Sequence, residues 1–321
     1  MNRSISQITA IASLTALEAI RQPVFLLVAT TCVLGIGLMP ILITHTLGEA
    51  QKLVLDSALA LYFVCGLILG GYAACSTLTR EIRQGTVATV LSKPVNRGLF
   101  FVSKFLGIGA VMLVFSLNAT LATLLSTRTA AEDFMMDWRS GGPLLAAPLL
   151  AYGFAGLRNF ITRKPFASGA FAAMTVCMAL AFLASGWVDE HGHRTAFGAH
   201  VPWQVLPAGA LIAMAILVLA ALAVSLASRL DTLPNLSLCT VVFLVGLMSD
   251  YLFGRHAADH AFAALLYRLI PNWQHFWVVD ALHNGYPIPW AYVTWVGSYA
   301  LLFVSGILGL GMFAFQKTDV S

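Results

Sequence analysis

Long apolar stretches alternate with short polar segments along most of the chain. A bilayer core about 30 Å thick requires about 20 apolar residues in a helix. We therefore predict eight spanning helices, at residues 24–46, 54–78, 99–127, 143–157, 166–187, 206–227, 236–253 and 290–315. The fourth is short and contains Pro143 and Pro148, so it spans only if its helix begins early or the bilayer thins locally. The expected fold is one all-α polytopic membrane domain over residues 1–321, with about eight spans and a range of six to eight.

Two segments outside these spans are also expected at the membrane surface. Residues 4–22 have apolar side chains at every third position, which drift around a helix and give only local amphipathicity. We predict that residues 1–22 form an interfacial helix before Pro23; the alternative is an N-terminal extension of the first span. Residues 254–289 are too polar to cross as one helix but contain amphipathic stretches at 261–270 and 273–282, which we place at the external interface. The alternative is a cytoplasmic location with a different number of spans.

The composition excludes a soluble domain. Apolar residues make up 59% of the chain and charged residues 10%, whereas about a quarter of the residues of soluble domains are charged. No arginine-rich run interleaved with aromatic residues indicates nucleic-acid binding, so no nucleic-acid partner is expected. The 5 cysteines lie in or beside apolar spans without a paired spacing and are expected to pack in the interior.

The positions of the basic residues predict the orientation. With eight spans and both termini on one side, that side receives twelve of the 18 lysine and arginine residues and the other side receives six. Cytoplasmic loops collect lysine and arginine. We therefore predict a multi-pass protein of the cell inner membrane with both termini in the cytoplasm, and we place residues 79–98 there as well.

The segment between the second and third spans is the most informative. Residues 79–104 contain five basic residues, and residues 81–91 can form a short amphipathic helix with Val87, Val90 and Leu91 on one side. Pro94 ends this helix, because proline disfavours the helical conformation of the residue before it. Asn96 is a suitable N-cap for the next span. The positive-inside rule explains the charge of this hairpin but not the order of its residues.

That order resembles the hallmark segment of ABC-2-type permeases, the membrane subunits of a large class of ABC transporters. The residues that carry the resemblance are Glu81, Gly85, Thr86, Leu91, Ser92, Pro94, Arg97 and Lys104. The N-terminal helix and the segment before the last span are similar to the family's elbow helix and external helix pair. Residues 128–250 show no such resemblance in detail, and eight spans are two more than the family usually has.

The resemblance implies that residues 79–98 form a cytoplasmic coupling hairpin whose helix docks into a groove of a separate ATPase subunit. Gly85 and Thr86 would allow close packing, and Val87 and Leu91 would fill an apolar groove. The basic residues would meet acidic groups or lipid phosphates. The full set of residues expected to couple to the ATPase is Glu81, Arg83, Gly85, Thr86, Val87, Leu91, Ser92, Lys93, Pro94 and Arg97.

The function implied is that of a permease subunit that couples ATP hydrolysis to export or to force transmission across the membrane. Its partners would be a cytoplasmic ABC ATPase, a second permease copy or homologue, and membrane lipid. The chain has no GxxxxGK[ST], GxSxG or HExxH motif, so we expect no enzyme activity and no cofactor in the chain itself, with ATP and Mg bound by the partner. The spans are nearly free of acids and bases, which indicates that the driving energy comes from elsewhere.

Two other functions are consistent with the sequence. One is a non-transporting membrane scaffold or maturation factor for an extracytoplasmic assembly. The other is a membrane-embedded enzyme that uses a metal held by Asp189, Glu190, His191, His193 and His200. A solvated loop is the simpler interpretation of these histidines, so no metal is expected.

Overall fold

The computed structural model describes residues 2–43, 49–83, 96–130, 137–188, 193–283 and 286–316. All regular elements in these ranges are helices, and Val188 and Arg194 form an isolated antiparallel bridge. Seven described helices are long and apolar enough to cross a membrane, or eight if one bent pair counts as a single span. The predicted all-α polytopic membrane fold is confirmed.

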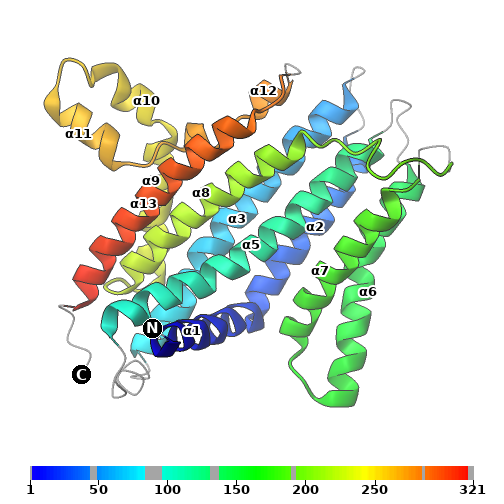
Figure 1. The fold of residues 1–321 in the computed structure, drawn as a ribbon, viewed down its shortest axis with the longest axis horizontal. Coiled ribbons are helices and arrows are strands. Elements are labelled where there is room, and N and C mark those ends of the chain that lie inside the picture. Colours follow the sequence, from blue (N-terminus) through cyan, green and yellow to red (C-terminus); the bar gives the residue numbers. More distant parts are fainter. Residues whose placement is uncertain are drawn as a thin grey trace.

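The helices that build the bundle follow the predicted order (Figure 1). Their bounds are α1 (Asn2–Arg21), α2 (Pro23–Leu42), α3 (Ala50–Arg83), α5 (Arg97–Thr129), α6 (Trp138–Thr162), α7 (Phe166–Ser185), α8 (Val205–Ala227), α9 (Thr232–Leu247) and α13 (Trp290–Gln316).

Two predicted boundaries change because a helix is longer than its apolar stretch. Helix α6 has 25 residues and begins at Trp138, five residues before Pro143, so the early start needed for a fourth span is present. Residues 138–142 are therefore helical and not part of a polar loop. Helix α3 continues to Arg83, so Glu81 belongs to this helix and does not begin a separate short one. The rest of the predicted coupling helix lies outside the described residues.

The seventh predicted span is broken, in contrast to the expected single helix over 236–253. Helix α9 ends at Leu247, and α10 (Ser249–Leu252) with the following turn bends away by 65°. Gly246 allows this arrangement: a Cβ there would lie 2.4 Å from the Pro271 carbonyl oxygen and 2.5 Å from Trp273 Nε1. The returning chain therefore packs directly on the last turn of α9.

Helix α5 lies at the centre of the bundle and contacts α1, α2, α3, α6, α7, α8 and α13. Glycines let α3 approach its neighbours closely: a Cβ on Gly66 would lie 2.1 Å from Ile216 Cδ1 of α8, and one on Gly71 would lie 3.1 Å from Leu236 Cδ2 of α9. The buried Asn118 of α5 donates to Thr175 Oγ1 of α7 at 2.9 Å. This polar residue therefore joins two helices.

The segment before the last span contains η1 (Gly254–His256), α11 (Ala261–Leu269), η2 (Trp273–His275) and α12 (Val279–His283). Helix α11 confirms the first predicted amphipathic stretch. The second stretch does not form one helix, and Trp273, Phe276, Val279 and Leu282 on it are buried. These apolar side chains pack into the protein, so residues 273–282 do not form the separate amphipathic helix that was predicted.

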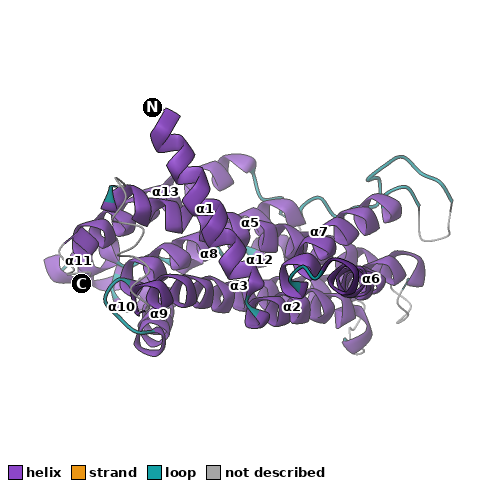
Figure 2. Ribbon diagram, turned by 90° about the horizontal axis from the view of Figure 1, so that it is seen from below, coloured by secondary structure: helices purple, strands orange, loops and turns teal. Residues whose placement is uncertain are grey.

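The two ends of the bundle differ. At one end, helix α1 lies across the long helices, and the ends of α3 and α5 that flank residues 84–95 lie there together with the end of α13 (Figures 1 and 2). At the other end lie α10, α11 and α12. There the buried Arg128 donates to the carbonyl oxygens of Ser185 and Val188, so its guanidinium caps the C-terminus of α7.

Candidate functional site

The predicted coupling residues fall beside the described structure or at its edge. Glu81 and Arg83 lie in the last turn of α3, and Arg97 is the exposed first residue of α5. The seven residues of the set between 85 and 94 lie outside the described residues. Asn96 caps α5 as predicted, because its side-chain oxygen accepts from the Gly98 amide at 2.9 Å.

Helix α1 touches α5 through its backbone, two to three turns beyond this cap. A Cβ on Gly107 would lie 2.4 Å from the Ala12 carbonyl oxygen and 2.8 Å from Thr15 Cβ. Distances under 3.0 Å exclude any side chain larger than hydrogen unless a helix moves. Gly107 is therefore where the interfacial helix is seated on the central helix.

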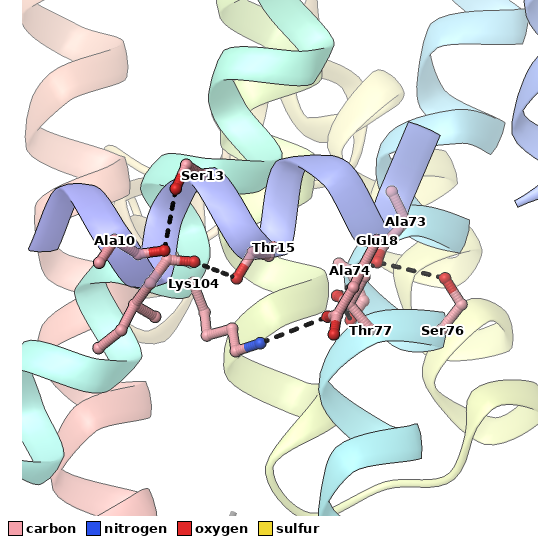
Figure 3. A network of polar contacts seen from close by, with 10 residues as sticks. Ala10, Ser13, Thr15, Glu18, Ala73, Ala74, Ser76, Thr77 and Lys104 are labelled. Carbon is pink, nitrogen blue, oxygen red and sulfur yellow. Dashed lines mark hydrogen bonds and ion pairs between the residues drawn. The ribbon is translucent and has the colours of Figure 1, made fainter. Parts of the chain in front are cut away.

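An ion pair lies one turn from this contact. Lys104 Nζ is 3.7 Å from Glu18 Oε2, with side-chain exposures of 2% for the lysine and 38% for the glutamate. The lysine also lies 5.5 Å from the centroid of the Phe100 ring, a cation–π distance. Figure 3 shows Lys104 reaching from α5 towards Glu18 of α1. Because Lys104 and Gly107 are three residues apart on one helix, they present one face to α1.

The hydroxyl groups around this pair are satisfied within their own helices. Thr15 donates to the Ile11 carbonyl at 2.9 Å on α1. Thr77 donates to the Ala73 carbonyl at 2.8 Å on α3 (Figure 3). These hydroxyls are therefore committed to helix carbonyls and are not arranged around a ligand. We name the contact region of α1, α3 and α5 around Lys104, Glu18 and Gly107 the elbow junction.

Sequence reasoning included Lys104 in the hallmark segment but missed Glu18 and Gly107. The available signal was the position of Glu18, which is the first acidic residue of the chain and the only one before Glu49. A single acidic residue in the N-terminal helix, together with a lysine seven residues inside α5, indicates a pair.

A double-mutant cycle tests the ion pair. Glu18→Gln leaves the Lys104 cation in its buried site without this partner, whereas adding Lys104→Met removes the cation as well. We expect a coupling free energy of about 1–2 kcal/mol, below the 3–5 kcal/mol cost of breaking fully buried pairs because Glu18 is partly exposed. Thermal unfolding of the purified protein measures it.

The matched control is the pair Glu49–Lys52 at the opposite end of the bundle. Its atoms are closer, at 3.0 Å, but its side chains are 51% and 44% exposed. The same cycle with Glu49→Gln and Lys52→Met should give a coupling near zero, because exposed pairs contribute about 0–1 kcal/mol. Equal coupling for both pairs would show that the Lys104–Glu18 contact has no special strength.

A second feature is an apolar crevice on the membrane-facing side of the bundle. It has a volume of about 420 Å³ and lies between α2, α3, α8 and α9. Ile68 and Val64, at 51% and 53% exposed, lie at its opening. The lining consists of Val24, Val28, Val64, Leu67, Ile68, Leu69, Gly71, Tyr72, Leu219, Leu236, Cys239, Thr240 and Phe243.

Only some of the candidate metal ligands lie within the described residues. Asp189, Glu190 and His191 lie outside the described residues, whereas His193 and His200 lie in the loop between α7 and α8. In the described part of the chain, no group of three or more histidine, cysteine or acidic side chains could hold a metal ion.

Comparison with known proteins identifies no relative of this chain. No protein-family model, curated protein or solved structure matches this chain.

Proposed function

We propose that this chain is the membrane subunit of an ABC transporter and that residues 84–95 dock onto a separate ATP-hydrolysing subunit. The observation that carries the proposal is the elbow junction. The two helices that flank residues 84–95 are long, and one of them is the central helix of the bundle, held to the interfacial helix by Gly107 and by the Lys104–Glu18 pair. A force on the hairpin is thereby delivered to the core of the membrane domain.

The arrangement of α5 supports this mechanism. Helices in close-packed bundles move as rigid bodies between discrete arrangements. Because α5 contacts seven other helices, a tilt of α5 changes the packing of most of the domain. ATP-driven closure of the partner would push on the hairpin, and the tilt of α3 and α5 would move cargo or transmit force across the membrane.

The distribution of charge also supports the proposal. Helix α1, the flanks of the hairpin, the α6–α7 turn and the α8–α9 turn lie at one end of the bundle, and these segments carry most of the basic residues. By the positive-inside rule this end faces the cytoplasm, where an ATPase is available. The described spans carry no Asp, Glu, Lys, Arg or His at mid-depth, so they offer no side chain of the kind that usually carries a coupling proton or sodium ion.

The apolar crevice is the proposed path of the cargo. Its volume falls within the range of about 300–1,000 Å³ for small-molecule pockets. It opens towards the bilayer and is lined mostly by aliphatic side chains, which suits a hydrophobic, lipid-like cargo. Because α3 forms one wall, movement of the hairpin would change the width of the crevice.

Affinity purification of the tagged chain from native membranes tests the proposed function. Recovery of a P-loop ATPase in equal amount, with ATP hydrolysis by the purified complex, is the expected result. Recovery of the chain alone, or with extracytoplasmic proteins and no ATPase, would contradict the permease and favour the scaffold.

A further inference from the structure

The segment between α9 and α13 forms a polar cleft at the end of the bundle opposite to α1. The cleft has a volume of about 580 Å³. Its lining contains a carboxylate, a guanidinium, a phenol and an amide, from Asp250, Arg255, Tyr267 and Gln274, together with Tyr251 and Gly254. It is separate from the elbow junction and from the apolar crevice.

The carboxylate in the cleft is held firmly. Asp250 Oδ1 accepts from Tyr267 Oη at 2.7 Å and from Asn272 Nδ2 at 2.8 Å. Asn272 is buried, and its backbone N–H donates to Tyr299 Oη of α13 at 2.9 Å. The hydrogen bond to Asp250 raises the pKa of Tyr267, which keeps this hydroxyl protonated as a donor. Both bonds use Oδ1, so among the described residues the second oxygen, Oδ2, has no partner.

The guanidinium in the cleft is not paired with this carboxylate. Arg255 Cζ lies 4.6 Å from the centroid of the Tyr251 ring and forms no ion pair with an acidic residue of the described part of the chain. Stacking on an aromatic ring covers the face of a guanidinium and leaves its N–H edge available for an anion. The cleft therefore presents one negative and one positive group that are not neutralised by each other.

Helix α11 places the cleft at the bilayer surface. Phe262, Leu265 and Leu269 are 72%, 59% and 64% exposed and lie on one face of this helix. Tyr267 lies on the other side and reaches Asp250. In a membrane protein such an exposed apolar face enters the bilayer interface. The cleft then opens at the depth of the lipid headgroups.

We propose that this cleft binds the headgroup of phosphatidylethanolamine, a zwitterionic lipid with a primary ammonium. The ammonium would donate to Asp250 Oδ2, and the phosphate would accept from Arg255, two charge-assisted hydrogen bonds. A purely anionic headgroup would meet the Asp250 carboxylate, and the quaternary ammonium of phosphatidylcholine has no N–H to donate. Phe262, Leu265 and Leu269 would lie beside the acyl chains.

Lipid retention measured by native mass spectrometry tests this site. The purified full chain is mixed in separate samples with phosphatidylethanolamine, phosphatidylglycerol and phosphatidylcholine. We expect the wild type to retain phosphatidylethanolamine about tenfold more strongly than the other two lipids, the effect of one charge-assisted hydrogen bond. Asp250→Asn should abolish this preference, and Arg255→Gln should weaken retention of phosphatidylethanolamine by a similar factor.

Two matched variants control for charge alone. Asp259 and Arg268 are exposed residues of the same segment outside the cleft lining, so Asp259→Asn and Arg268→Gln should retain lipid as the wild type does. Arg255→Gln leaves the bonds of Asp250 in place, and its unfolding midpoint should equal that of the wild type. Equal retention of the three lipids by the wild type, or equal loss in the control variants, would overturn the proposal. Displacement of the lipid by soluble glycerophosphoethanolamine at equal concentration would overturn the assignment to a membrane lipid.

Discussion

Replacing Gly107 with alanine is expected to unseat α1 from α5. The added methyl group would lie 2.4 Å from the Ala12 carbonyl oxygen, a backbone atom that cannot rotate away. In an ordinary helix interior this substitution stabilises by about 1 kcal/mol. Here overpacking costs about 1–3 kcal/mol, so we expect a net loss of stability and a lower unfolding midpoint.

The control for this substitution is Gly109→Ala, two residues further along α5. A Cβ at Gly109 meets only Leu217 Cδ2 at 3.4 Å, the end of a flexible side chain. We expect this variant to be as stable as the wild type or slightly more stable. If both variants had the same unfolding midpoint, close contact between α1 and α5 at Gly107 would be contradicted. In the purified complex, Gly107→Ala should also lower ATP hydrolysis, because the elbow junction is proposed to receive the force from the hairpin.

Placing an aspartate at Val87 or Leu91 is expected to have the larger effect on function. These residues are predicted on the apolar side of the coupling helix, where docking removes them from water. Burying an ionised carboxylate in an apolar groove costs several kcal/mol, which corresponds to a loss of affinity of about a hundredfold or more. The amount of ATPase recovered with the tagged chain measures the effect.

Leu233→Asp is the matched control, with the same change at the same end of the bundle. Leu233 is 78% exposed in the first turn of α9, where an acidic residue suits the helix dipole. We expect normal membrane insertion for all three variants and normal ATPase recovery for Leu233→Asp alone. Full recovery with Leu91→Asp would show that the hairpin does not dock as proposed.

Most of the membrane topology is predictable because it depends on local sequence. A helix such as α8 is apolar throughout. Backbone groups left unpaired in lipid are costly, so the segment stays helical across the whole bilayer and its length is close to the bilayer thickness. The predicted span at 206–227 therefore matches Val205–Ala227 within one residue. The same local logic identified the Asn96 cap, because capping involves only neighbouring residues.

The break after α9 depends on residues distant in sequence. Gly246 permits the Pro271–Trp273 segment to lie against α9, and only the folded chain brings these residues together. The same contact explains why residues 273–282 do not form the separate surface helix that their amphipathic pattern predicts. Trp273 is 1% exposed and packs against Phe243, with ring centroids 5.6 Å apart, so its apolar side faces protein instead of lipid.

Only one partner of the ion pair in the elbow junction could be predicted from the sequence. Lys104 was identified from the order of residues in the hairpin, but its partner Glu18 lies 86 positions earlier in the chain. No local pattern specifies which face of α1 meets α5. The face is set by the close approach at Gly107, because the absence of a side chain there lets the backbone of α1 pack directly on α5.

Photo-crosslinking in native membranes is the most direct test of the proposed docking of residues 84–95 on an ATPase. A photoreactive amino acid replaces Val87 in one variant and Phe262, on α11 at the opposite end, in a control. A light-dependent adduct between position 87 and a P-loop ATPase, with none from position 262, is the predicted result. The absence of such an adduct at position 87, or its formation from position 262 instead, would contradict the permease function.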